Sequence, residues 1–260
     1  MQHHDATIEG YVAAVRGRAE VLGVVVVGSV ARGTPREDSD VDVYLVVTDD
    51  AYADARAAGR IADVSQDGVT YPGGYVDIKL ASPGFLLTAA DRADDPTRAS
   101  FAGAEVALDK TGELPALIAA VVTVPEEVWA RRVAAYRAQA RLHGGYFLKQ
   151  ADQLGDHFLI QHAAVHLALA AGRIALAQHR RFFSGPKYLS AALAELELPD
   201  RFTASWRNVV AAPSAAVGQH LLEAIDAWLG PPEAFELQLS RFIADNELAW
   251  LNDTIPPEFW

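Results

Sequence analysis

Two aspartates stand two residues apart at the start of an apolar run. Residues 40–47 read DVDVYLVV, a β-branched pattern typical of a strand. Residues two apart on a strand point to one face, so the carboxylates of Asp40 and Asp42 lie side by side. Val41 and Val43 then take the opposite, buried face. Adjacent carboxylates repel each other, and a divalent cation relieves that repulsion. Hard oxygen ligands of this kind suit Mg²⁺, which takes its other ligands from water and phosphates.

A third carboxylate stands in another alternating run, YVDIKLA at residues 75–81. Asp77 shares a face of this predicted strand with Tyr75 and Lys79. If the strand neighbours residues 40–47, Asp77 lies beside the first acidic pair. Three converging carboxylates predict a site for two Mg²⁺ ions, one holding a nucleoside triphosphate and the other lowering the pKa of an attacking hydroxyl.

A Gly-Ser turn precedes the acidic pair, within GSVARGTPREDS at residues 28–39. Gly28 has no Cβ, so its backbone can approach a phosphate closely. Ser29 adds a hydroxyl donor, and successive backbone N–H groups in such a turn form an anion-binding concavity. Arg32 is positioned either to reach phosphate or to pair with Asp38. Ser39 is positioned either to bind phosphate or to cap the loop. This turn therefore predicts a nucleotide-binding segment.

The combination GSVARG…SDVDV resembles the signature of the polymerase-β-like nucleotidyltransferase superfamily, a Gly-Ser turn followed by an acidic pair on the next strand. It is similar to the minimal nucleotidyltransferases and to the aminoglycoside and lincosamide nucleotidyltransferases, over residues 20–110. The resemblance implies that Asp40 and Asp42 ligate metal and that the Gly-Ser pair binds the triphosphate. It also implies that Asp77 completes the metal site or acts as general base.

The elements that must position these residues form two regions of different composition. In the first, the pattern predicts strands at 23–27, 40–47, 75–81 and 105–109, with helices at 7–21 and 51–63. After Pro125 the chain is rich in Ala, Leu, Arg and Gln, and predicts helices at 126–142, 144–179, 186–197, 214–229 and 233–252. The fold class is therefore α+β, a mixed-sheet nucleotidyltransferase domain at 1–124 followed by an all-α helical bundle at 125–260 that binds substrate or partner.

The helical half offers basic and imidazole side chains. Residues 131–190 carry nine Lys plus Arg against two acidic residues, a net +7, which leaves −19 for the remainder of the chain. Lys149 and Lys187 are the candidates to contact phosphate, because Lys187 begins a helix after a Gly-Pro turn. His162 and His166 form an HxxxH pair, but no third ligand accompanies them, so zinc binding is not favoured. RRFFSGPKYL at residues 180–189 resembles a helical domain that follows such nucleotidyltransferase domains in bacteria.

The composition limits the classes of partner. The 260 residues are 51% hydrophobic, contain no cysteine and have a formal net charge of −12. Disulfides and cysteine-based metal sites are thereby excluded. A long polyanion is disfavoured as the main partner. The start MQHHDATIEG lacks a signal-peptide pattern, and the apolar stretches are judged too short or too polar to cross a bilayer. We expect a soluble, cytoplasmic protein with no membrane partner.

The expected activity is magnesium-dependent transfer of a nucleoside monophosphate, AMP from ATP, to a hydroxyl of a small molecule, with release of pyrophosphate. An aminoglycoside or lincosamide antibiotic is the acceptor that the resemblance implies, which would make the chain an antibiotic-resistance enzyme. Transfer to tRNA or to a partner protein, as in toxin–antitoxin pairs, is the first alternative. A non-catalytic nucleotide-binding module is the second, although degenerate members would lose an acid of the DxD pair.

Overall fold

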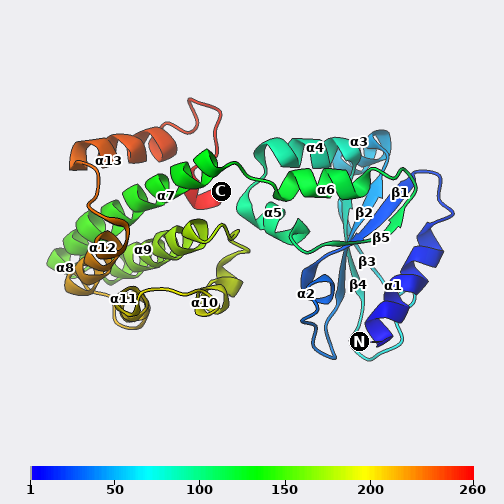
Figure 1. Ribbon diagram of the computed structural model, residues 1–260, viewed down its shortest axis with the longest axis horizontal. Coiled ribbons are helices and arrows are strands. Elements are labelled where there is room, and N and C mark those ends of the chain that lie inside the picture. Colours follow the sequence, from blue (N-terminus) through cyan, green and yellow to red (C-terminus); the bar gives the residue numbers. More distant parts are fainter. Residues whose placement is uncertain (1) are drawn as a thin grey trace. The chain divides into compact units, whose positions relative to one another are not determined.

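A computed structural model describes residues 2–260. They divide into two compact units, one up to residue 123 and the other from residue 124 to residue 260. The first unit is built around a sheet of five strands (Figure 1). The strands are β1 Val21–Val26, β2 Val41–Val47, β3 Ala62–Ser65, β4 Val76–Ala81 and β5 Glu105–Asp109. Its helices are α1 Gln2–Val15, α2 Gly28–Ala31, α3 Asp49–Ala57, α4 Pro83–Arg92, α5 Asp95–Phe101 and α6 Leu114–Val122.

The sheet is mixed, in the order β3-β4-β2-β1-β5. β2 and β4 pair in parallel, and the other neighbours pair antiparallel. Both faces of the central strands β1 and β2 are buried, because their side chains alternate between two apolar clusters. Val24 and Val43 pack on one face with Tyr11 of α1, while Val25 and Tyr44 pack on the other face with residues of α4, α5 and α6. This burial explains why the central strands are almost continuously apolar.

The second unit is all helical. Its elements are α7 Glu126–Arg141, the π-helix η1 Leu142–Phe147, α8 Leu148–Leu154, α9 His157–Gln178, α10 Pro186–Ala194, α11 Asp200–Ala211, α12 Ala215–Leu229, α13 Phe235–Phe242, the π-helix η2 Ile243–Glu247 and the 3-10 helix η3 Pro257–Phe259. Its core lies between α7, α9, α11 and α12, with Tyr136, Leu167, Phe202 and Leu221 almost fully buried. The predicted α+β class, with a helical region after the sheet, is confirmed.

Several predicted boundaries were wrong. The single helix expected at 144–179 is interrupted, because Gly155 adopts the left-handed conformation (φ 64°) and ends α8. The Asp156 side chain then caps α9 by accepting a hydrogen bond from the Leu159 N–H at 3.1 Å. The sequence analysis also did not predict β3, α4, α5, α6 or α11.

The expectation that no segment could cross a bilayer was also wrong by length and composition. Among the described residues, α9 is long and apolar enough to span a membrane. However, 61% of the most apolar 18-residue stretch of this helix is buried inside the helical unit. Its apolar residues therefore form the core of this unit, as in a soluble fold, and its composition reflects that burial.

Candidate active site

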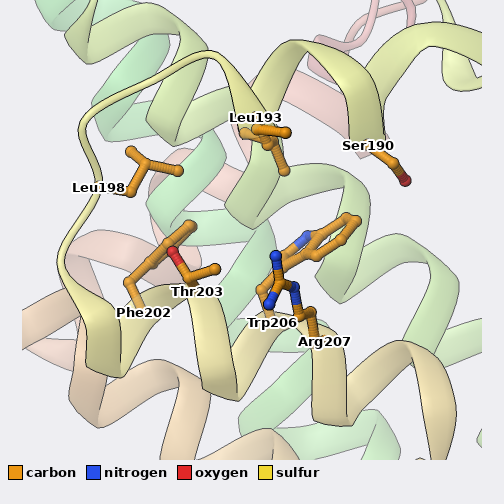
Figure 2. Close-up of a pocket in the computed structure, with 8 residues that line it drawn as sticks. Ser190, Leu193, Leu198, Phe202, Thr203, Trp206 and Arg207 are labelled. Atoms are coloured by element: carbon orange, nitrogen blue, oxygen red, sulfur yellow. The ribbon is translucent and has the colours of Figure 1, made fainter.

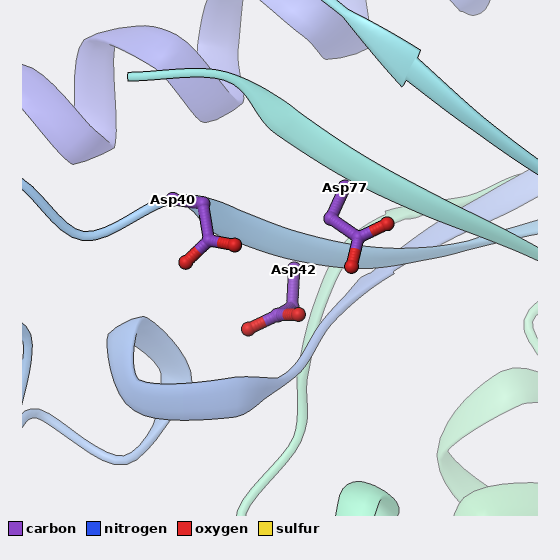
Figure 3. Close-up of side chains that lie close together, drawn as sticks. All are labelled: Asp40, Asp42 and Asp77. Atoms are coloured by element: carbon purple, nitrogen blue, oxygen red, sulfur yellow. The ribbon is translucent and has the colours of Figure 1, made fainter. Parts of the chain in front are cut away.

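Three carboxylates converge where two neighbouring strands begin. Asp42 and Asp77 are register partners in the parallel pair of β2 and β4, and Asp40 stands immediately before β2. One oxygen from each side chain lies within 4.8 Å of the other two. Figure 3 shows the three side chains directed to the same region from the two strands. Within residues 2–260, no other group of three potential metal ligands meets this distance.

The charges of the site are only partly compensated by the protein. The pKa of Asp42 is raised, first by burial and then by the neighbouring carboxylate of Asp40, with a smaller contribution from Asp77. Lys79 and Arg32 oppose this shift. A raised carboxyl pKa means that the ionised form lacks sufficient stabilisation here. A divalent cation supplies that stabilisation, and three hard oxygen donors fit Mg²⁺.

Gly28 lies directly against the acidic group. Its φ is +72°, a conformation that residues with a Cβ rarely adopt. A Cβ at this position would lie 2.0 Å from Asp42 Oδ2. The N–H of Val27, directly before α2, donates to the Asp42 carbonyl at 2.9 Å and so joins this segment to β2. Glycine is therefore required here for contact with the carboxylate. Residues 28–31 form the short helix α2 and not the loop that the composition predicted.

Ser39 and Arg32 stand on either side of the loop between α2 and β2. The Ser39 hydroxyl accepts a hydrogen bond from the Arg36 N–H at 2.9 Å, so this side chain caps the loop. Arg32 is exposed at the end of α2. The pairing of Arg32 with Asp38 that the sequence analysis considered was wrong, because Asp38 accepts from Nε of Arg36 at 3.0 Å. Arg32 remains a prediction for phosphate binding.

The two predicted phosphate-binding lysines belong to the second unit, whereas the carboxylates belong to the first. Lys149 is exposed on α8, and Lys187 is exposed in the first turn of α10. Lys187 Nζ lies 5.2 Å from the centroid of the Tyr188 ring. Phosphate binding by both lysines therefore stays a prediction.

The HxxxH pair joins a cluster of imidazoles that sequence spacing alone did not indicate. His143 of η1 is buried and stacks on His166, with ring centroids 4.7 Å apart. His162 lies 4.3 Å from His166 by the same measure. His166 Nδ1 approaches Glu258 Oε2 at 3.4 Å. The ligand atoms of this cluster do not converge as those of the aspartates do, so it lacks the geometry of a metal site.

Residues around the entry to β2 were missed by the sequence analysis. Tyr71, in the turn before β4, donates its hydroxyl to the Ser39 carbonyl at 2.6 Å. His4 of α1, for which no role was expected, lies 3.2 Å from the same oxygen through Nε2. These contacts join residues 32 and 35 positions apart, so no local spacing could have signalled them.

The second unit also contains cavities. One lies between α10 and α11 and has an empty volume of about 300 Å³, counted with its open mouth. Figure 2 shows Phe202, Trp206 and Arg207 of α11 lining it opposite Leu193 of α10. Its walls are mainly apolar, and it shares no residue with the carboxylate site.

Comparison with known proteins agrees with this geometry. Residues 8–80, which include all three aspartates and the Gly-Ser turn, match the model of the nucleotidyltransferase domain family. These residues of the first unit are a nucleotidyltransferase domain. The chain is accordingly a transferase of nucleotidyl groups, as the resemblance implied. Comparison with curated proteins gave no match.

Two solved structures are similar to the whole chain. The crystal structure of a nucleotidyltransferase-like protein from Exiguobacterium sibiricum 255-15 aligns with a TM-score of 0.50 and 10% identity, over 96% of this chain and 79% of that chain. At this identity the similarity shows the fold alone. Terminal uridylyl transferase 4 from Trypanosoma brucei with bound UTP aligns with a TM-score of 0.30 and 16% identity, over 99% of this chain and 80% of that chain.

Proposed function

We propose that this protein transfers a nucleoside monophosphate, AMP from ATP, to a hydroxyl group of a small molecule and releases pyrophosphate. The observation that carries the proposal is the convergence of Asp40, Asp42 and Asp77 inside a nucleotidyltransferase domain. The nucleobase of the triphosphate, the number of metal ions and the chemical class of the acceptor are all part of this proposal.

The three carboxylates would hold two Mg²⁺ ions. Two observations support this role: the ligand oxygens lie within 4.8 Å of one another, and the ionised form of Asp42 is only partly compensated by nearby positive charge. Bound Mg²⁺ neutralises phosphate charge and lowers the pKa of a coordinated hydroxyl. Asp40 and Asp42 would act as metal ligands from β2, and Asp77 would act from β4 as third ligand or as general base toward the acceptor hydroxyl.

The turn at Gly28 and Ser29 would hold the triphosphate. No side chain caps the start of α2, so the backbone N–H groups of this turn are available to phosphate oxygens. The closeness of Gly28 to Asp42 supports this assignment, because phosphates bound at the turn would also reach metal held by the carboxylates. Arg32 would add charge from the end of α2, with Ser39 shaping the loop. Lys149 and Lys187 of the helical unit are further candidates for phosphate binding.

The distribution of charge favours a small acceptor over nucleic acid. The net +7 of residues 131–190 does not form an open cationic face, because acids outside the segment neutralise much of it. The pairs are Arg137 and Arg141 with Asp226, Arg180 with Glu126, and Arg181 with Glu195. Arg132 and Arg173 are buried. Binding of a polyanion needs several exposed cations together, whereas the net charge of −12 suits a cationic acceptor.

The helical unit contains a cavity with polar groups in its wall. Its empty volume is about 580 Å³, counted with its open mouth, and it lies between α7, α9 and the C-terminal segment. Gln139, His143, His166 and Glu258 line it with hydrogen-bonding groups, which supports an acceptor that carries hydroxyl or amino groups.

A transfer assay tests the proposal. The purified protein is incubated with each α-labelled nucleoside triphosphate, Mg²⁺ and one of three acceptors: a panel of aminoglycosides and lincosamides, bulk tRNA, or a protein extract. We expect label on a small molecule, with ATP preferred. Label found only on tRNA or on a protein would replace the small-molecule acceptor by a macromolecule. If Asp40→Asn left transfer and nucleotide affinity in Mg²⁺ unchanged, the chain would be a non-catalytic module.

A further inference from the structure

The orientation of Asp40 is not determined by the sheet. The ladder between β2 and β4 begins at Val41, so Asp40 stands one residue outside it, after a loop whose residues 36–38 are exposed. A metal ligand in such a position has more conformational freedom than Asp42, which is inside the strand. Contacts from outside the β2–β4 ladder must hold this residue if the three carboxylate oxygens are to converge.

Residues 71–75 hydrogen-bond to the residues on both sides of Asp40. The Tyr71 hydroxyl donates to the Ser39 carbonyl at 2.6 Å. The Tyr75 carbonyl accepts from the Val41 N–H at 3.0 Å. The backbone before Asp40 and the backbone after it are thus both held by one segment.

Helix α1 adds a second donor to the same carbonyl. His4 is fully buried, and its Nε2 lies 3.2 Å from the Ser39 carbonyl oxygen. Burial lowers the pKa of His4, and the adjacent His3 lowers it further, so the ring is neutral. A neutral imidazole that donates from Nε2 carries its lone pair on Nδ1, which has no partner within the described residues. The His4 and Tyr71 rings are in contact, with centroids 5.2 Å apart.

The position of Tyr71 itself depends on a glycine. Gly74 packs against the Tyr71 ring so closely that a Cβ would lie 2.5 Å from its carbon atoms. The Gly74 N–H donates to the Tyr71 carbonyl at 3.3 Å and closes the turn. The turn at residues 71–74 therefore places the Tyr71 hydroxyl against the Ser39 carbonyl.

We propose that Tyr71 and His4 are positioning residues that hold the backbone at Asp40 in the place needed for metal binding. The inference rests on the proposed function, because it assumes that Asp40 is a metal ligand. Groups that support a metal ligand orient it and tune its affinity, and their removal typically weakens metal binding about 10- to 100-fold. Tyr71 and His4 act through the carbonyl of the preceding residue, Ser39.

Metal binding, measured apart from activity, tests this inference. Mn²⁺ serves as a paramagnetic substitute for Mg²⁺, and its binding to the full chain with a non-hydrolysable ATP analogue is followed by electron paramagnetic resonance. We expect Tyr71→Phe to raise the Kd for Mn²⁺ about tenfold, with little change in Tm. Tyr52→Phe is the matched control, because the Tyr52 ring packs on Phe85 in the same unit, away from the loop. For His4, we expect His4→Leu to weaken binding and His4→Gln, whose amide can still donate, to restore it.

The outcomes separate this inference from the proposed function. If Tyr71→Phe and His4→Leu both bound Mn²⁺ as the wild type does, the positioning role would be overturned. A wild type that binds Mn²⁺ and nucleotide but transfers label to no acceptor would remove the proposed function and leave the positioning of Asp40 standing. A wild type that binds no metal would overturn both.

Discussion

Asp42 and Asp77 stand directly opposite each other across the parallel ladder of β2 and β4. Because the pairing fixes their separation, replacing one carboxylate removes a metal ligand without moving the other. We expect Asp42→Asn to lower the rate of nucleotidyl transfer at least about 100-fold, since metal stabilisation of transition-state charge contributes several kcal/mol. Steady-state assays at saturating Mg²⁺ measure this. Asp50→Asn, on the exposed side of α3, is the control and should retain activity; an active Asp42→Asn would exclude the carboxylate site.

Gly28 and Gly33 offer a matched pair for separating backbone strain from contact with the site. Both have positive φ, +72° and +70°, but only Gly28 has a side chain within 4 Å of an added Cβ. Each alanine variant should lose about 1–2 kcal/mol of stability from the left-handed conformation. Only Gly28→Ala should also lose transfer activity, because its Cβ would displace Asp42. Equal activity loss in both variants would show that strain, and not the contact with Asp42, matters.

The helical unit should lose stability at acidic pH through His143. Burial, together with the neighbouring imidazoles of His166 and His162, lowers the pKa of His143 to about 3. The unfolded chain binds this proton near pH 6.5 but the folded chain does not, so the folded state is fully stable above that pH. Between pH 6.5 and about 3 the stability falls, by about 2 kcal/mol at pH 5. His166 acts in the same direction, because its pKa is also lowered.

Tryptophan fluorescence isolates this effect, because all five tryptophans lie at or beyond residue 129, in the helical unit. Urea unfolding followed by fluorescence at pH 8 and at pH 5 gives the difference in the free energy of unfolding between the two pH values. His143→Gln, which cannot be protonated, should reduce the pH dependence. A variant with the same pH dependence as the wild type would contradict the assignment to His143.

Asp226 joins α12 to α7 through two arginines. It accepts a hydrogen bond from Arg137 at 3.1 Å and another from Arg141, and its side chain is only 25% exposed. We expect Asp226→Asn to lower the stability of the helical unit by about 2 kcal/mol, since hydrogen bonds to charged groups contribute more than neutral ones. Glu223→Gln, on the same helix, is the control. Its pair with Arg201 is largely exposed and should contribute less than about 1 kcal/mol.

The local sequence already specified much of the first unit. Strand periodicity of two placed Asp40 and Asp42 on one side and Val41 and Val43 on the other, and both valines are buried as that alternation requires. The Gly-Ser turn followed by the acidic pair was enough to identify the domain family at residues 8–80. These features depend on neighbours within a few residues, which is why a single sequence reveals them.

Tertiary structure alone decided the remaining features, because they join residues far apart in the chain. The register that sets Asp77 beside Asp42 is a parallel pairing, and the intervening crossover carries no signal for it. The contacts of His4 and Tyr71 with Ser39 depend on how α1 and the turn before β4 pack. The local sequence thus determined which residues carry the chemistry, while long-range packing decided which of them meet and what holds them in place.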